Sequence, residues 1–178
     1  MKKVLAIVLA LVVVVAAFAA CGGAKITPYE GSLTDLTASL HEANTDLIGF
    51  MLGSTDALDF ADEESWTYYP SFTGLESAEG ITEGYRTETG FGMQPYSLVL
   101  LRTAEGADIE AIKNAMFNGI DTRKWICTEA DQLRVVSSAD IIMLVMAGSE
   151  FAPGLADGMV EAFKTNVGEL SGEVLTRG

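Results

Sequence analysis

The chain has few of the side chains that bind zinc or that activate a nucleophile. Its 178 residues include one histidine, His41, and two cysteines, Cys21 and Cys127. A zinc site needs three or four nitrogen or sulfur ligands, and a Ser-His or Cys-His catalytic site would have to use His41. We assign His41 to the solvated face of a helix, and we expect no cofactor and no enzymatic activity.

Basic residues are also scarce. The chain has 11 Lys and Arg against 25 Asp and Glu, a net charge of −14. The net charge becomes −16 if Lys2 and Lys3 are removed with a signal peptide. Such a surface repels nucleic acid and anionic lipid head groups. We therefore expect no nucleic-acid partner.

One long hydrophobic run is present, Val4–Ala20, and it follows Lys2 and Lys3. This order is typical of a secretory signal. The run ends in Phe18-Ala19-Ala20-Cys21, which resembles a lipobox, with Phe at the position where Leu is commoner. We predict that residues 1–20 are a lipoprotein signal peptide and that Cys21 carries the lipid. Its acyl chains, palmitate among them, would anchor the exported protein to the outer face of the cytoplasmic membrane.

An alternative stays open for the same run. Its length is close to the roughly 20 residues that span a bilayer, so the signal could be retained as a span. If Cys21 is lipidated, Cys127 has no disulfide partner. Cys127 lies in the apolar stretch Trp125-Ile126-Cys127-Thr128, and free cysteine packs as a small hydrophobe. We predict that Cys127 is buried and inert.

The rest of the chain has the size of one domain. Residues 21–31 are rich in glycine and are expected to form a flexible tether, and residues 32–178 to form a single α+β domain. Ser32 with Asp35 predicts the start of a helix over Leu33–Met51. The aromatic stretch Trp66–Tyr69 predicts a strand that ends at Pro70.

The second half of the chain has clearer periodicity. It predicts strand, helix, strand, strand, helix, with a small mixed or antiparallel sheet and helices packed on it. Because Ile141–Met146 is apolar at every position, we place it centrally, with both faces covered. The predicted elements are a strand over Tyr85–Phe91, a strand over Tyr96–Arg102, a helix over Ala107–Asn118 that is capped by Asp108 and ended by a left-handed stop at Asn118-Gly119, a hairpin over Leu133–Met146, and a helix that starts at Pro153 and has Leu155, Met159, Phe163 and Val167 on one face.

Three aromatic residues are the candidate ligand platform: Trp66, Tyr68 and Tyr69. Flanked by acids, they could hold a sugar or a cation. Alternation along a strand would bury Trp66 and Tyr68 together and expose Tyr69.

Acidic residues offer two further alternatives. A cluster before the aromatic residues could bind calcium, but it lacks the residue order of an EF-hand, and a solvated face explains it as well. A carboxylate pair could hydrolyse glycosides, although 25 acids place some pair at a suitable distance by chance. The cluster consists of Asp56, Asp59, Asp62, Glu63 and Glu64.

The order of these elements resembles that of one group of exported proteins, the small Gram-positive lipoproteins grouped as domain of unknown function 4358. The resemblance covers Ser32 to Lys164 and rests on element order and apolar pattern. The glycine-rich stretch Gly74–Gly92 is longer than in that group. The resemblance implies export and fold, and no known activity. It is carried by the lipobox, the first helix, Tyr68-Tyr69-Pro70, Tyr96–Arg102, Asp108–Met116, Trp125, the Leu133–Met146 hairpin, and Phe163 with Lys164.

From these features we expect a non-enzymatic binding or protein-interaction module at the cell envelope, whose partner is an envelope protein or a small ligand. A small-ligand binder, for a sugar or a cation, is the alternative, followed by a carboxylate-based hydrolase. A ligand binder should have a concave pocket near residues 66–72. An interaction module should expose an apolar patch or a sheet edge.

Lipidation of Cys21 can be tested by labelling cells with radioactive fatty acid. We expect the wild-type protein to be labelled and the Cys21→Ala variant to lose the label, because the sulfur is the attachment atom. Equal labelling of both proteins would contradict the anchor.

Overall fold

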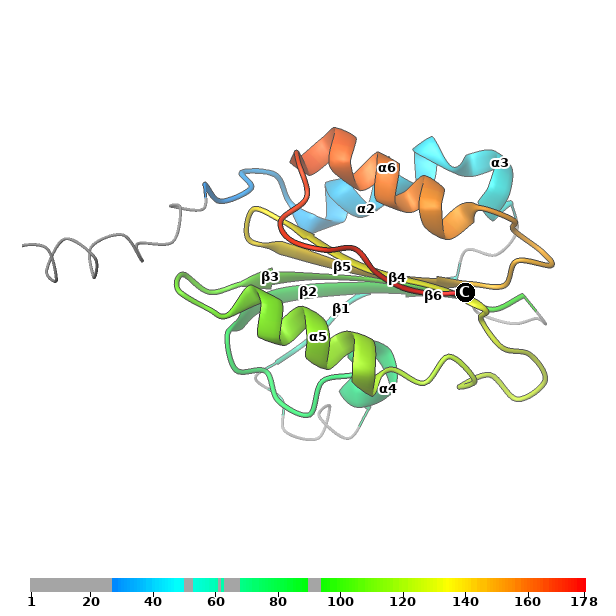
Figure 1. The fold of residues 1–178 in the computed structure, drawn as a ribbon, viewed down its shortest axis with the longest axis horizontal. Helices are drawn as coiled ribbons and strands as arrows, with labels where there is room; N and C mark the ends of the chain where they lie inside the picture. The colour runs from blue at the N-terminus through cyan, green and yellow to red at the C-terminus, as the bar shows by residue number, and fades with distance from the viewer. Residues whose placement is uncertain (1–26, 50–52, 61, 63–67, 90–93) are drawn as a thin grey trace, which may run out of the picture.

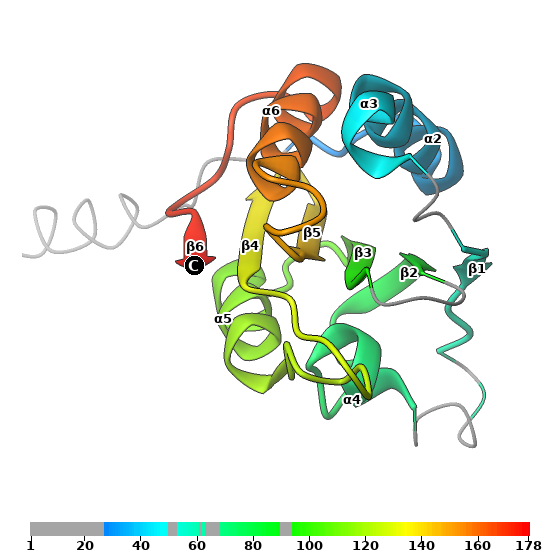
Figure 2. The same cartoon turned by 90° about the vertical axis from the view of Figure 1, so that its right-hand side faces the viewer.

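The computed structural model describes residues 27–49, 53–60, 62, 68–89 and 94–178. Six antiparallel strands form one sheet in the order β1-β2-β3-β5-β4-β6, with helices on both of its faces (Figures 1 and 2). This confirms the predicted α+β class. The strands are β1 (Thr55–Ala57), β2 (Ile81–Glu88), β3 (Tyr96–Thr103), β4 (Gln132–Ser138), β5 (Ile141–Ala147) and β6 (Leu175–Arg177). The helices are α2 (Leu33–Ala43), α3 (Thr45–Ile48), α4 (Tyr69–Thr73), α5 (Ile109–Gly119) and α6 (Leu155–Val167).

Strand β5 lies between β3 and β4, and every one of its residues is buried. Successive side chains of a strand point to opposite faces. Ile141, Met143 and Val145 therefore join the core beneath α2 and α6, whereas Ile142 and Leu144 join the core on the α4 and α5 side. The prediction that this strand has both faces covered is confirmed.

The first helix is shorter than predicted. Its start is confirmed, since the Ser32 hydroxyl accepts a hydrogen bond from the Asp35 amide at 3.0 Å. It ends at Ala43 because the chain turns at Asn44, whose buried side-chain amide donates to the Leu40 carbonyl at 2.9 Å. The separate turn α3 follows. Residues 50 and 51, the end of the predicted helix, lie outside the described residues.

The predicted cap of helix α5 is confirmed, since the Asp108 side chain accepts from the Ala111 amide, but the helix starts at Ile109 rather than at Ala107. The prediction that Gly119 ends it in a left-handed conformation is wrong. The capping residue is Ile120, with φ −71°. Gly119 instead lies against Gly74 after α4, where a Cβ on Gly119 would overlap the Gly74 carbonyl oxygen. The glycine thus permits a close approach of two backbones.

The predicted strand at the aromatic stretch is also wrong. Tyr69 is the first residue of helix α4 and Pro70 lies in its first turn, a position where proline's missing N–H costs nothing. Trp66 and Thr67 lie outside the described residues. The strand predicted over Tyr85–Phe91 corresponds to β2, which the described residues show from Ile81 to Glu88.

Two basic side chains hydrogen-bond to backbone segments near the two ends of the described domain. The Arg102 guanidinium donates to the carbonyls of Tyr29 and Gly31 at 2.8 and 2.7 Å, and to Asp140 at 3.0 Å. Part of the expected tether, which includes Tyr29, therefore contacts the domain. The fully buried Lys113 of α5 holds the segment that leads to β6.

Lys113 and Lys164 provide a matched test, since each pairs with a glutamate three residues earlier. The Lys113 ammonium also donates to the carbonyls of Ser171 and Glu173 at 3.3 and 2.9 Å. We expect Lys113→Met to lower the free energy of unfolding by about 2–3 kcal/mol, because two carbonyls lose a charged donor. The partly exposed Lys164→Met should cost less than about 0.5 kcal/mol. Equal losses in chemical denaturation would contradict the role of Lys113.

Candidate functional site

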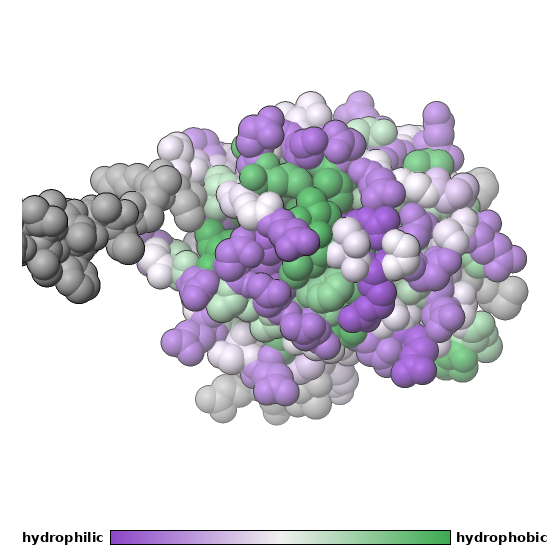
Figure 3. All heavy atoms as spheres, viewed as in Figure 1, coloured by the Kyte–Doolittle hydropathy of each residue, from purple (hydrophilic) through white to green (hydrophobic). Residues whose placement is uncertain are grey.

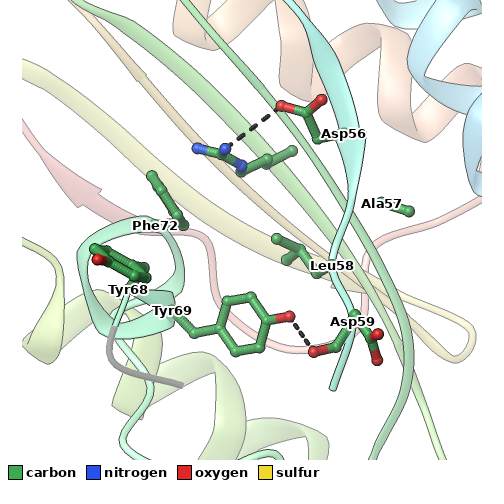
Figure 4. Close-up of a pocket in the computed structure, with 8 residues that line it drawn as sticks. Asp56, Ala57, Leu58, Asp59, Tyr68, Tyr69 and Phe72 are labelled. Carbon is green, nitrogen blue, oxygen red and sulfur yellow. Dashed lines mark hydrogen bonds and ion pairs between the residues drawn. The ribbon is translucent and has the colours of Figure 1, made fainter. Parts of the chain in front are cut away.

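A pocket of about 360 Å³ lies between β1, the residues that follow it, and helix α4. Figure 4 shows Asp56, Leu58 and Asp59 on the strand side of this pocket, and Tyr68 and Phe72 on the helix side. Ala57, Tyr69 and Arg86 complete the lining. A pocket near residues 66–72 is what the small-ligand alternative requires, and this one is lined by Tyr68, Tyr69 and Phe72 of that stretch.

The two described aromatic candidates do not lie as predicted. Tyr68 is 65% exposed, whereas Tyr69 is only 4% exposed, the reverse of the burial expected from a strand. The two side chains are placed by helix α4 rather than by a strand. Tyr69 points into the core on the α4 and α5 side of the sheet, and its hydroxyl donates to the Asp59 carbonyl. Tyr68 precedes the first turn and faces solvent. Trp66, the third candidate, lies outside the described residues.

Arg86 of β2 forms the charged wall of the pocket. Its guanidinium pairs with Asp56 at 3.4 Å and with Glu88 at 3.3 Å. The same group lies over the Phe72 ring, 3.7 Å from the centroid, a cation–π arrangement. Arg86 therefore connects β1, β2 and α4, and it fixes the position of the Phe72 ring.

Lys124, from the segment between α5 and β4, lies next to this wall. Its ammonium pairs with Glu88 and donates to the Ser71 carbonyl at 3.1 Å. It is also 5.3 Å from the Phe72 centroid. Burial lowers the pKa of Lys124, and the Glu88 carboxylate offsets part of this effect. Sequence reasoning missed Lys124 and Arg86, because a charged side chain is expected on the surface unless its partner is known.

This arrangement is suited to binding. Tyr68 offers an open aromatic face, while the Arg86–Asp56 pair offers donors and acceptors whose positions are already set. The side chains of Asp56 and Arg86 are 46% and 25% exposed, so a ligand can reach both. An apolar wall with a few fixed polar groups is the usual make-up of a small-ligand site.

Cys127 does not contribute to the pocket, and its predicted burial is wrong. The thiol is exposed, and the neighbouring Ile126 is fully exposed. The residues between α5 and β4 form turns rather than a strand. Lys124 pairs with Glu88 and Trp125 packs against the core on the α4 and α5 side, whereas Ile126 and Cys127 face solvent.

The acidic cluster does not form a metal site in the part of the chain that the structure describes. No group of three or more potential ligands occurs among the described residues. Asp56 pairs with Arg86 instead. Glu63 and Glu64 lie outside that part.

His41 is half-buried rather than solvated. Its Nε2 lies 2.9 Å from the hydroxyl of the fully buried Tyr96. Burial lowers the pKa of His41 to about 4 and raises the pKa of Tyr96. The pair joins α2 to β3, and neither residue lines the pocket.

Comparisons of the chain with models of protein families, with curated proteins and with solved structures found no match. The resemblance to the lipoproteins of domain of unknown function 4358 gains no support from them and stays a prediction. Cys21 and residues 1–26 lie outside the described residues. Within the described ranges, no helix has the length and apolar character needed to cross a membrane.

His41 gives a prediction for pH. Its pKa is about 4 in the folded protein and near the ordinary 6.5 in the unfolded chain. The unfolded state therefore binds more protons between these values, and stability must fall as the pH is lowered from about 6.5 to about 4. Water screens a half-buried ring, so we expect a loss of about 1–2 kcal/mol. Because His41 is the only histidine, the His41→Gln variant should not show this fall in the free energy of unfolding. The measurement is chemical denaturation at a series of pH values. An identical pH dependence in both proteins would contradict it.

Proposed function

We propose that the protein is a lipid-anchored, non-enzymatic binding module on the outer face of the cytoplasmic membrane. Its ligand is a small uncharged polyhydroxylated molecule of the sugar class, bound in the pocket between β1 and α4. The observation that carries this proposal is the pocket itself, where the exposed ring of Tyr68 lies beside the Arg86–Asp56 pair. A sugar can stack its C–H face on such a ring and exchange hydrogen bonds with the charged pair.

The charges around the pocket favour an uncharged ligand over a cation. The Phe72 ring already has the Arg86 guanidinium and the Lys124 ammonium within 6 Å of its centroid. An added cation would be repelled by both, and it would compete with Arg86 for Asp56. An anion is disfavoured by the strongly negative net charge of the chain. The cationic alternative is therefore the weaker of the two.

Binding is also better supported than hydrolysis. A glycosidase needs two carboxyl groups free to act on the two sides of the scissile bond. Asp56 is instead engaged by Arg86, and Glu88 is engaged by Arg86, Lys124 and Ser97. These contacts set the shape of the wall.

The proposal can be tested by titrating the full-length protein with a panel of neutral and N-acetylated mono- and disaccharides, followed by NMR. We expect Tyr68→Ala to weaken binding by about tenfold, because it removes the open ring, a loss in the range of single binding hot spots. The control is Phe151→Ala, which truncates another exposed aromatic residue, outside the pocket.

Two outcomes would contradict the proposal. Absence of saturable binding by every sugar in the panel is one. The other is equal weakening by Tyr68→Ala and Phe151→Ala, which would place the bound sugar elsewhere.

A further inference from the structure

A second concavity lies on the other side of α4, between helix α5 and the segment that joins α4 to β2. Its volume is about 530 Å³. We call it the α5 groove. Its lining residues are Gly74, Leu75, Glu76, Ser77, Glu79, Ala111, Ile112, Ala115, Asn118 and Gly119. None of them takes part in the Arg86–Lys124 network.

The floor of the α5 groove is apolar and open. Ala111 and Ala115 are exposed, and they lie one helical turn apart on the same face of α5. Ile112 is half-buried beside them, and the buried Leu75 lies at the base. Because the alanine side chains are short, larger apolar side chains from another molecule can enter.

The rim of the groove is acidic, and the domain does not neutralise it. Glu76 and Glu79 are exposed and form no ion pair with any described residue. The structure describes eight Lys and Arg side chains, and seven pair with a carboxylate. The eighth, Arg177, lies over the Phe117 ring. Cations that complement this rim must therefore come from outside the described domain.

We propose that the α5 groove binds a basic amphipathic segment of a second protein. The apolar side chains of that segment pack on Ala111, Ile112 and Ala115, and its Lys or Arg side chains pair with Glu76 and Glu79. Charge complementarity selects this occupant. A second copy of this acidic chain would be repelled, and so would a nucleic acid. Figure 3 shows one face of the molecule, where hydrophilic residues surround a central apolar patch.

The probe for this test is a fluorescein-labelled peptide of about a dozen residues, with Lys and Leu at helical spacing. It is titrated with the full-length protein in a nonionic detergent, with empty micelles as the background, and binding is followed by fluorescence anisotropy. We expect saturable binding that weakens about tenfold in the double variant Glu76→Gln/Glu79→Gln, because both rim charges are lost. Ala115→Arg, at an exposed helical position, should also block the groove.

The matched control is the double variant Glu42→Gln/Asp46→Asn, which removes two exposed carboxylates on the opposite helical layer. Its affinity should stay within about twofold of the wild type. Hydrogen exchange should show that the peptide protects α5. Equal weakening in the two double variants would mean that net charge alone attracts the peptide, and it would overturn the proposal. Absence of saturable binding, or protection confined to other elements, would do the same.

Discussion

The structure depends on the burial of strand β5. Ile141–Ala147 contains no polar side chain, and all its residues are buried, so neither face of the sheet can be left to water. Each fully buried large side chain contributes about 1.5–3 kcal/mol, which makes two helical layers necessary. Figure 2 shows these layers edge-on. The α2 and α6 layer mainly fills the core, whereas the α4 and α5 layer bears both concavities.

Two lysine side chains with little exposure, Lys113 and Lys124, hold backbone segments of that second layer in place. Lys113 fixes the path of the chain beside α5, and Lys124 fixes the path beside α4. With Arg86, Lys124 holds the Phe72 ring in place before any ligand arrives. A site with its side chains already ordered loses less conformational entropy on binding. For the ligand proposed above, the charged network therefore favours affinity as well as stability.

The sequence correctly predicted the features that depend on hydrophobic periodicity and on helix capping. Strand β5, the cap at Asp108 and the face of α6 that carries Leu155, Met159 and Phe163 depend on local spacing, and all three were found. The pocket depends on contacts between distant residues. Arg86 and Asp56 are 30 positions apart, and Lys124 and Glu88 are 36 apart. Local pattern carries no signal for such pairs. The apolar context of Cys127 likewise gave no sign that its thiol is exposed.

The attachment of the N-terminal segment has a mechanical consequence. Arg102 belongs to β3, and Asp140 lies in the turn between β4 and β5, so Tyr29 and Gly31 are tied to the interior strands rather than to an edge. A pull on the chain before Tyr29 is thus delivered to the middle of the sheet, where strands have neighbours on both sides. Short edge strands such as β1 and β6 are spared that load, and the domain resists being peeled open from its N-terminal side.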